Sequence, residues 1–499
     1  MHPRLRALAD LLAPDMRELA GRHEYDGHVP DLSPAGVGAA LARLGGEPMP
    51  DPHTEAHVAT HEAAARVQYG QLRVHRTNPL VHLTALDVSC YDRTYAPEPE
   101  RAQARTTHLK QWPDAVDVAV TALDEVPAPV AAALVPAARG LAAAVRDDDA
   151  DVGTAATAAV DRLVGHLEVA AREGRADAAI GRRALEALMT QTDALPFDAA
   201  VVGARAERER ERLWAVLTEA VARLAPGEPV AAIVASLLAD HPQADSVLDE
   251  ARVLSAETVA FTAAHDLAPV DGELVVEQSP PSRRWAVAMM AWSAPYEPDA
   301  PSLYSITPPD PAWTAAEQAQ WLSMFSRTTL PAITVHEVAP GHFSHGRALR
   351  RCEGDVPRLL QGAAFAEGWA HYVEELFVEL GFRADDPRFA VGVALEALCR
   401  VVRLECAIGI HTGAFDVDEA TRRFEAHALM GNSGARAEAR RATFDPAYGC
   451  YTWGKWAILD QRDRAQREWG PQFSLPRFHR ALLALGSPPL GLLDAAVSA

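Results

Sequence analysis

Lysine is nearly missing from this chain of 499 residues. Of its 47 basic residues only Lys110 and Lys455 are lysines, and the rest are arginines. The chain also has 68 acidic residues, which gives it a formal net charge of −21. Nucleic acids and anionic membranes both attract positive surfaces, so this balance argues against either as a partner.

The chain also lacks the cysteine patterns of disulfide-rich and cysteine-ligated metal proteins. Its five cysteines are scattered and form no C-x-x-C pair, which predicts buried free thiols in a reducing compartment. The N-terminal residues show no signal-peptide pattern, and no apolar run reaches the roughly 20 residues of a membrane span. Together these absences predict a cytoplasmic protein. They leave its oligomeric state open.

No long polar linker or internal repeat divides the chain, so we expect one domain over residues 1–499. Residues 1–265 contain Ala-, Leu- and Val-rich runs with helical spacing. Residues 266–310 predict a small β-sheet, because short apolar or alternating stretches lie there between prolines, at Glu273–Gln278, Trp285–Trp292 and Ser302–Thr307. Residues 311–499 are again helical. The predicted fold class is mainly α with a small sheet.

One short segment carries recognisable chemistry. His336 and Glu337 form the first half of the zinc motif H-E-x-x-H, in which the histidines bind the metal and the glutamate is a general base. The next histidine, His342, comes six residues after the first rather than four, and an unbroken helix would hold the two apart. Pro340 and Gly341 lie between them. We expect one helix with a local bulge that loops two residues out and returns His342 to the first face.

A third ligand is needed, because a catalytic zinc takes three protein ligands and leaves one position open. Glu367 lies 25 residues after His342 in A-E-G-W-A-H-Y-V-E-E, on a helix expected at Leu359–Leu380. His371 and Glu374 follow on the same helix face. We expect Glu374 to orient a ligand histidine through its free ring N–H, and His371 either to compete as a ligand or to line the pocket.

These residues resemble a known family. H-E-V-A-P-G-H and E-G-W-A-H-Y-V-E are similar to the paired motifs of the bacterial domain-of-unknown-function 885 (DUF885) family, whose members are regarded as glutamate-zincin (gluzincin) metallopeptidases. Weaker similarities occur at Tyr25–Ser33, Arg76–Leu80, Arg403–His411 and Tyr451–Gly454. The resemblance implies a zincin-like helical body with the sheet beside the metal-binding helix. It also implies a zinc ion (Zn2+) held by His336, His342 and Glu367, with Glu337 as the base.

Other polar residues are candidates for contact with substrate. Tyr451 and Tyr448 lie on a glycine-containing turn before the last long helix, and a phenol near the metal donates well to an oxyanion. Tyr451 is our first candidate for this role because Gly454 follows it as in the family, and His411 is the second. On the helix expected at Phe389–Gly409, Arg400 and Arg403 could bind a substrate carboxylate. Alternatively, they pair with acidic neighbours, Glu396 and Glu405.

The chain departs from the family pattern at three places. His345 stands where the family usually has glutamine, Ala407 replaces an acidic residue, and Pro446–Tyr448 replaces a P-G-Q turn. The metal motif is intact while positions near the substrate differ. This contrast predicts altered specificity, for example toward a peptide-like natural product.

The sequence therefore predicts a zinc-dependent hydrolase of peptide or peptide-like amide bonds, of the carboxypeptidase or oligopeptidase kind. Two alternatives come from other classes. One is a zinc enzyme that uses the metal as a Lewis acid for another reaction, such as a lyase. The other is a metal-stabilised binding protein without catalysis, which the intact Glu337 disfavours because a structural zinc needs no base.

Overall fold

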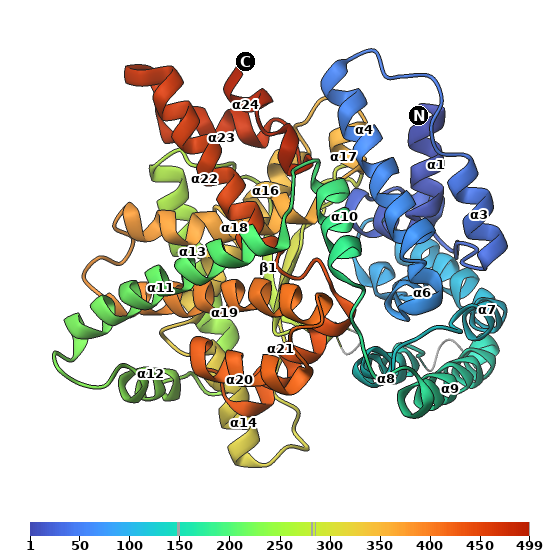
Figure 1. Cartoon of the computed structure of the whole chain (residues 1–499), viewed down its shortest axis with the longest axis horizontal. Helices are drawn as coiled ribbons and strands as arrows, with labels where there is room; N and C mark the ends of the chain where they lie inside the picture. Colours follow the sequence, from blue (N-terminus) through green and yellow to red (C-terminus); the bar gives the residue numbers. More distant parts are fainter. Residues whose placement is uncertain (147–149, 281–282, 285, 499) are drawn as a thin grey trace.

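The computed structural model describes residues 1–146, 150–280, 283–284 and 286–498. About 67% of the chain is helical and one small three-stranded sheet is present, so the mainly α prediction is confirmed. No helix in the described part of the chain combines the length and the apolar character needed to cross a bilayer. Figure 1 shows the N-terminal helices on one side and the C-terminal helices on the other.

The first 265 residues are helical, as the spacing of their apolar residues predicts. Several helices begin at a proline in the first turn, where its missing N–H costs nothing, with a side-chain cap before it, as Ser33 and Asp51 provide. The helices are α1 (Pro3–Leu11), α2 (Ala13–Asp15), α3 (Pro34–Ala42), α4 (Pro52–Ala65), α5 (Val74–Thr77), α6 (Leu80–Leu86), α7 (Glu98–Ala122), α8 (Ala128–Ala142), α9 (Ala150–Glu173), α10 (Arg182–Asp193), α11 (Ala199–Leu224), α12 (Val230–Ala239) and α13 (Val247–Ala264).

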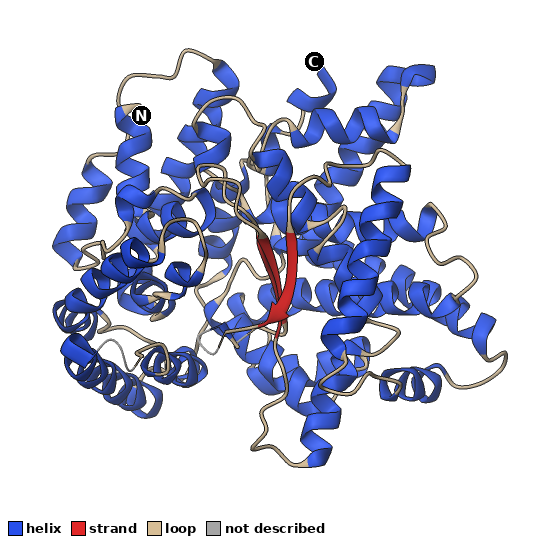
Figure 2. Cartoon of the chain, turned by 180° about the vertical axis from the view of Figure 1, so that it is seen from behind, coloured by secondary structure: helices blue, strands red, loops and turns tan. Residues whose placement is uncertain are grey.

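The sheet lies near the middle of the molecule among the helices (Figure 2). Its strands are β1 (Leu274–Gln278), β2 (Ala288–Ala291) and β3 (Ser302–Ile306), in the spatial order β1-β3-β2. β3 is parallel to β1 and antiparallel to β2. The predicted strands are thus present, although the expected start of the second, Trp285, lies outside the described residues. β2 is an edge strand and contacts both α15 (Leu330–Glu337) and α16 (His342–Leu349).

The C-terminal half supplies the remaining helices. Thr314 and Glu317 form a reciprocal capping box at the start of α14, and Gly381 takes a positive φ just after α18 ends. Both devices satisfy backbone groups that a helix end leaves free. Besides α15 and α16, the helices are α14 (Ala315–Leu322), α17 (Val356–Leu359), α18 (Ala363–Glu379), α19 (Pro387–His411), α20 (Val417–Ala428), α21 (Asn432–Phe444), α22 (Cys450–Trp469), α23 (Leu475–Leu483) and α24 (Ala495–Ser498).

Three apolar clusters hold these elements together. The largest runs from Leu83 to Val497 and so joins helices from both halves of the chain. A second one joins the N-terminal helices to α17, and a third packs the sheet residues Tyr304 and Ile306 against Val338 and nearby side chains. Because the third cluster includes residues of both the sheet and the turn after α15, the sheet has a fixed place beside that turn.

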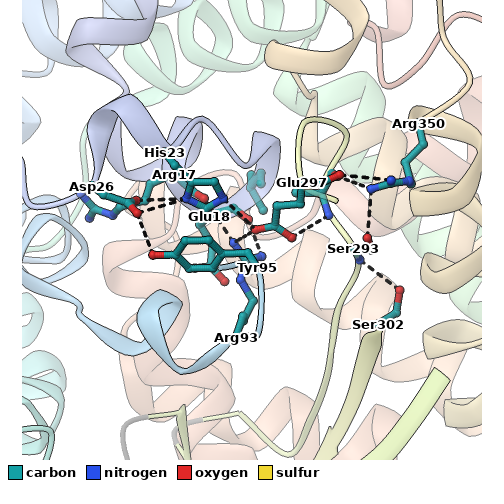
Figure 3. Close-up of polar contacts among 12 residues, drawn as sticks. Arg17, Glu18, His23, Asp26, Arg93, Tyr95, Ser293, Glu297, Ser302 and Arg350 are labelled. Carbon is teal, nitrogen blue, oxygen red and sulfur yellow. Dashed lines mark hydrogen bonds and ion pairs between the residues drawn. The ribbon is translucent and has the colours of Figure 1, made fainter. Parts of the chain in front are cut away.

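A buried polar cluster joins the N-terminal segment to the connection between β2 and β3 (Figure 3). We call His23, Asp26, Arg93, Tyr95 and Glu297 the N-terminal cluster. The Arg93 Nη2 donates to Glu297 Oε1 at 2.6 Å, and the Tyr95 hydroxyl donates to Asp26 Oδ2 at 2.7 Å. The His23 ring stacks on Tyr95 at 3.7 Å. These contacts fix the N-terminal segment against the sheet.

Candidate metal centre

The two histidines of the motif lie on two helices. α15 ends at Glu337, the chain leaves helical geometry at Val338, and α16 begins at His342. The prediction of one continuous, bulged helix is therefore wrong. The physical reason is that Val338 leaves the helical region, with a ψ of −98°, and the chain then turns back so that Gly341 packs against the end of α15. A Cβ on Gly341 would lie 1.9 Å from the carbonyl oxygen of His336, so only glycine fits this return.

The return nevertheless brings the predicted ligand residues together. The Nε2 atoms of His336 and His342 each lie 3.3 Å from Glu367 Oε2. One ligand atom from each of the three residues lies within 4.8 Å of the others. Trp369, two residues after Glu367, donates its indole N–H to the Pro340 carbonyl at 2.8 Å. This bond ties the turn between the histidines to the helix that carries the glutamate.

Glu337 lies beside this group without joining it. Its side chain is 8% exposed, and its Oε2 atom receives no hydrogen bond from the described residues. Burial raises the pKa of the Glu337 carboxyl, against the effect of the neighbouring His342 and His336. A buried carboxylate that lacks a donor and has a raised pKa is suited to accept a proton and release it again.

Glu374 supports the ligands from behind. Its Oε1 accepts from His336 Nδ1 at 2.6 Å, and its Oε2 lies 3.2 Å from His371 Nδ1 and 3.0 Å from Arg400 Nη1. Burial opposes the charge on this carboxylate, but Arg400 and the two imidazoles hold the pKa of Glu374 well below its usual range. Glu374 therefore stays charged and leaves His336 Nε2 to face Glu367, as the sequence predicted.

Arg400 and His371, two of the predicted site residues, both contact Glu374. Arg400 is buried and pairs with both Glu374 and Glu396, at 3.0 and 3.4 Å, so the structural alternative describes it better than a role in binding a substrate carboxylate. His371 contacts Glu374 and not the group of ligand atoms. Burial and the charge of Lys455 lower the pKa of His371 to about 3, so it stays neutral.

Tyr451 comes close to the ligands. Its ring centroid lies 6.3 Å from that of His336, and burial together with the charge of Glu367 raises the pKa of its hydroxyl. Tyr451 therefore remains a hydrogen-bond donor at neutral pH. Its helix, α22, crosses α18 where glycine meets glycine: a Cβ on Gly368 would lie 2.4 Å from the carbonyl carbon of Gly454.

Two other predicted histidines lie outside the group. His345 Nε2 contacts the Ser487 hydroxyl at 2.8 Å, and burial lowers the pKa of His345 to about 3. His411 was our second candidate for the oxyanion, and this prediction is wrong. It lies 11 residues beyond Arg400 on α19, about 16 Å further along the helix axis. There its Nε2 contacts the Ala442 carbonyl at 2.8 Å, so His411 joins two helices.

Sequence reasoning missed two neighbours of the site. Trp292, which follows β2 directly, has its ring centroid 5.9 Å from those of both His342 and His345. Nothing in its local sequence singles it out. Lys455 is 1% exposed, and its Nζ lies 3.1 Å from Glu375 Oε1. The rarity of lysine in this sequence was a usable signal, because a lysine in an arginine-rich chain points to a position where a guanidinium does not fit.

Comparison with known proteins agrees with this fold. Two solved structures are similar: a candidate lipoprotein of unknown function from Shewanella oneidensis, with 19% identity over 98% of both chains and a TM-score of 0.77, and one from Colwellia psychrerythraea, with 17% identity over 99% of this chain and 97% of the other and a TM-score of 0.80. At this identity the likeness concerns the fold alone. No curated protein matches the chain. The model of a family described as bacterial protein of unknown function (DUF885) matches residues 14–497, and the chain therefore belongs to the DUF885 family.

Proposed function

We propose that this protein is a zinc-dependent peptidase that hydrolyses peptide or peptide-like amide bonds. The observation that carries the proposal is the convergence of His336, His342 and Glu367 beside a buried carboxylate, Glu337, that accepts no hydrogen bond from the described residues. A structural metal site would not need that fourth group. The pairing of three ligands with a poised base is typical of metallohydrolases.

The donor set fits zinc. Two imidazole nitrogens and one carboxylate oxygen are the ligands of one class of catalytic zinc sites. Ligand atoms about 2.1 Å from an ion at tetrahedral angles lie about 3.4 Å apart. The two distances of 3.3 Å from Glu367 Oε2 to the histidine nitrogens agree with this value. His336, His342 and Glu367 would hold the ion, which when bound would polarise the scissile carbonyl and make a water more acidic.

The residues around the ligands supply the remaining steps. Glu337 would take the proton of the attacking water and deliver it to the leaving nitrogen. The Tyr451 hydroxyl would donate a hydrogen bond to the carbonyl oxygen as negative charge develops there. The edge strand β2 contacts α15 and α16, so its backbone offers pairing groups to an extended peptide whatever its side chains. This combination favours a peptide substrate within a zincin-like site.

Two measurements test the proposal together. Metal analysis of the purified protein should find about one zinc per chain, and a library of synthetic peptides should contain sequences that the zinc-loaded protein cleaves and the chelated protein does not. Zinc without cleavage would favour another reaction at the same metal. A protein that takes up no zinc at micromolar concentrations would contradict the proposal.

A further inference from the structure

Two arginines lie against the tyrosine rings beside the candidate metal centre. Arg403 on α19 lies over the rings of Tyr448 and Tyr451, with its Cζ 5.1 Å from each centroid. Arg441 on α21 lies over the Tyr448 ring at 4.5 Å. Tyr448 therefore has a guanidinium against it from each of two helices. Two separate helices, α19 and α21, therefore bring positive charge to the turn before α22.

Neither guanidinium uses all its donors. Arg403 binds Glu438 through Nε and Nη2, both at 2.8 Å, and Arg441 binds Asp445 Oδ2 through Nε and Nη2 at 3.3 and 3.2 Å. Within the described residues, the Nη1 atom of each arginine has no hydrogen-bond acceptor. The side chains are 16% and 37% exposed, so solutes can reach them.

The Tyr448 hydroxyl is a second, independent sign of a missing partner. This residue is 1% exposed, and its hydroxyl has no hydrogen-bond partner among the described residues. Buried hydroxyls nearly always have one. An anion bound by the unused Nη1 atoms would bring acceptor oxygens to the surroundings of this ring. A carboxylate suits the arrangement best, because guanidinium groups bind its two oxygens in parallel.

The distance to the metal centre suits the end of a peptide. The Tyr451 ring lies 6.3 Å from the His336 ring and 5.1 Å from Arg403 Cζ, so the guanidinium is at most about 11 Å from His336, the sum of the two distances. An extended peptide advances about 3.3–3.6 Å per residue. At most about three residues therefore fit between a bond cut beside His336 and a carboxylate held by Arg403.

We propose that Arg403 and Arg441, which both lie against Tyr448, form a subsite for the C-terminal carboxylate of a short peptide. The enzyme would then remove up to about three residues from the C-terminus of its substrate. This inference rests on the proposed peptidase function and narrows its substrate class.

The test compares synthetic pentapeptides that share one cleavable sequence. One has a free C-terminus, one has a C-terminal amide, and one has the amide plus a glutamate just after the cleaved bond. We expect kcat/KM for the free acid to exceed that for the amide at least about tenfold, which corresponds to one charge-assisted hydrogen bond. A recovery of the rate by the internal glutamate would show that the subsite reads any carboxylate nearby rather than the chain end, and would overturn the assignment to the C-terminus.

Arg441→Gln should remove most of this preference by raising KM for the free acid, while the zinc content stays at the parental value. Arg441→Lys should keep part of the preference. Arg436→Gln is the matched control on the same helix, because Arg436 is 48% exposed and pairs only loosely with Asp418, at 3.6 Å. It should behave as the parent does.

The two proposals fail in different ways. If the parent protein cleaves acid and amide equally, or if Arg441→Gln keeps the full preference, the carboxylate subsite is refuted while the peptidase proposal stands. If the zinc-loaded parent cleaves no peptide of either kind, both are refuted.

Discussion

Two buried clusters in this protein contain the same residue types and differ in what their carboxylates contact. In the N-terminal cluster each acid has a donor: Glu297 accepts from Arg93 Nη2 at 2.6 Å and from the Ala294 N–H at 3.2 Å, and Asp26 accepts from Tyr95. In the candidate metal centre, Glu367 faces two imidazoles, and Glu337 has a buried oxygen to which no described residue donates a hydrogen bond.

The difference shows that the number of histidines and acids does not identify a metal site. His23 lies 3.2 Å from Asp26 and 3.6 Å from Glu297, which resembles a ligand set on distance alone. Arg93 neutralises Glu297, however, and among the described residues only His336, His342 and Glu367 are arranged so that they could hold a metal ion. Substitutions in these clusters and at His411 should separate fold stability from metal binding and turnover, and the largest effect is expected in the N-terminal cluster.

Glu297→Gln should destabilise the fold and leave the metal centre intact. The substitution removes the carboxylate that pairs with the buried guanidinium of Arg93 at 2.6 Å. Breaking a buried pair in this way costs about 3 kcal/mol or more. Denaturant unfolding should show this loss in the free energy of unfolding, while zinc content of the folded protein stays at the parental value. A loss of zinc at unchanged stability would contradict the assignment of the two clusters.

Glu337→Gln should have the opposite pattern. It keeps the shape and removes the base, so turnover of a screened peptide should fall at least about a hundredfold, the low end of what a general base contributes. Zinc occupancy and stability should remain near parental, since Glu337 stands outside the ligand group. Glu367→Gln is the matched variant, and it should lose zinc because an amide is a poor ligand. Parental turnover by Glu337→Gln would refute the mechanism.

Glu374→Gln should weaken zinc binding about ten- to a hundredfold, the usual effect of removing a group that orients a ligand histidine. The carboxylate holds His336 through Nδ1 at 2.6 Å and is itself held by Arg400. Competition with a chelator measures the affinity. Unchanged affinity would mean that His336 is oriented by packing alone.

Zinc affinity should rise with pH up to about 9. Burial and Arg400 oppose a proton on His336, but Glu367 and Glu374 prevail and raise the pKa of its imidazole to about 9. Zinc must displace this proton, so each pH unit below that value should weaken binding up to about tenfold. In Glu374→Gln the break in this dependence should move to lower pH. Titrations with a chelator at several pH values give the slope, and a flat profile between pH 6 and 9 would contradict it.

The smallest effect is expected from His411→Asn. This histidine contacts the Ala442 carbonyl far along α19, so its loss should cost about 1 kcal/mol of stability, as one hydrogen bond does. The kcat of the folded protein on a screened peptide should not change. A large fall in kcat would restore His411 as a catalytic residue.

The sequence predicts those parts of the molecule that depend on local spacing. Helices, strands and the capping of α14 follow apolar periodicity and turn residues. The spacing of Glu367 and Glu374 on one helix places Glu367 beside the histidine Nε2 atoms and Glu374 at the Nδ1 atom of His336. Pro340 and Gly341 mark an interruption after Glu337, but the sequence alone could not decide between a bulge and two separate helices, because the turn is held by a distant residue, Trp369. The places of His411 and Arg400 depend on how α19 packs against its neighbours. That packing is set by residues far away in the chain.

The contact between Gly368 and Gly454 has a consequence for exchange of parts between relatives. A Cβ on Gly454 would lie 1.8 Å from the Ala364 carbonyl oxygen, so neither helix accepts a larger residue at the crossing. One helix carries Glu367 and the other carries Tyr451. A chimaera that takes one of these segments from a distant homologue should therefore fold correctly only when both parents have glycine at this crossing. Otherwise the two segments must be exchanged together, although a long stretch of chain lies between them.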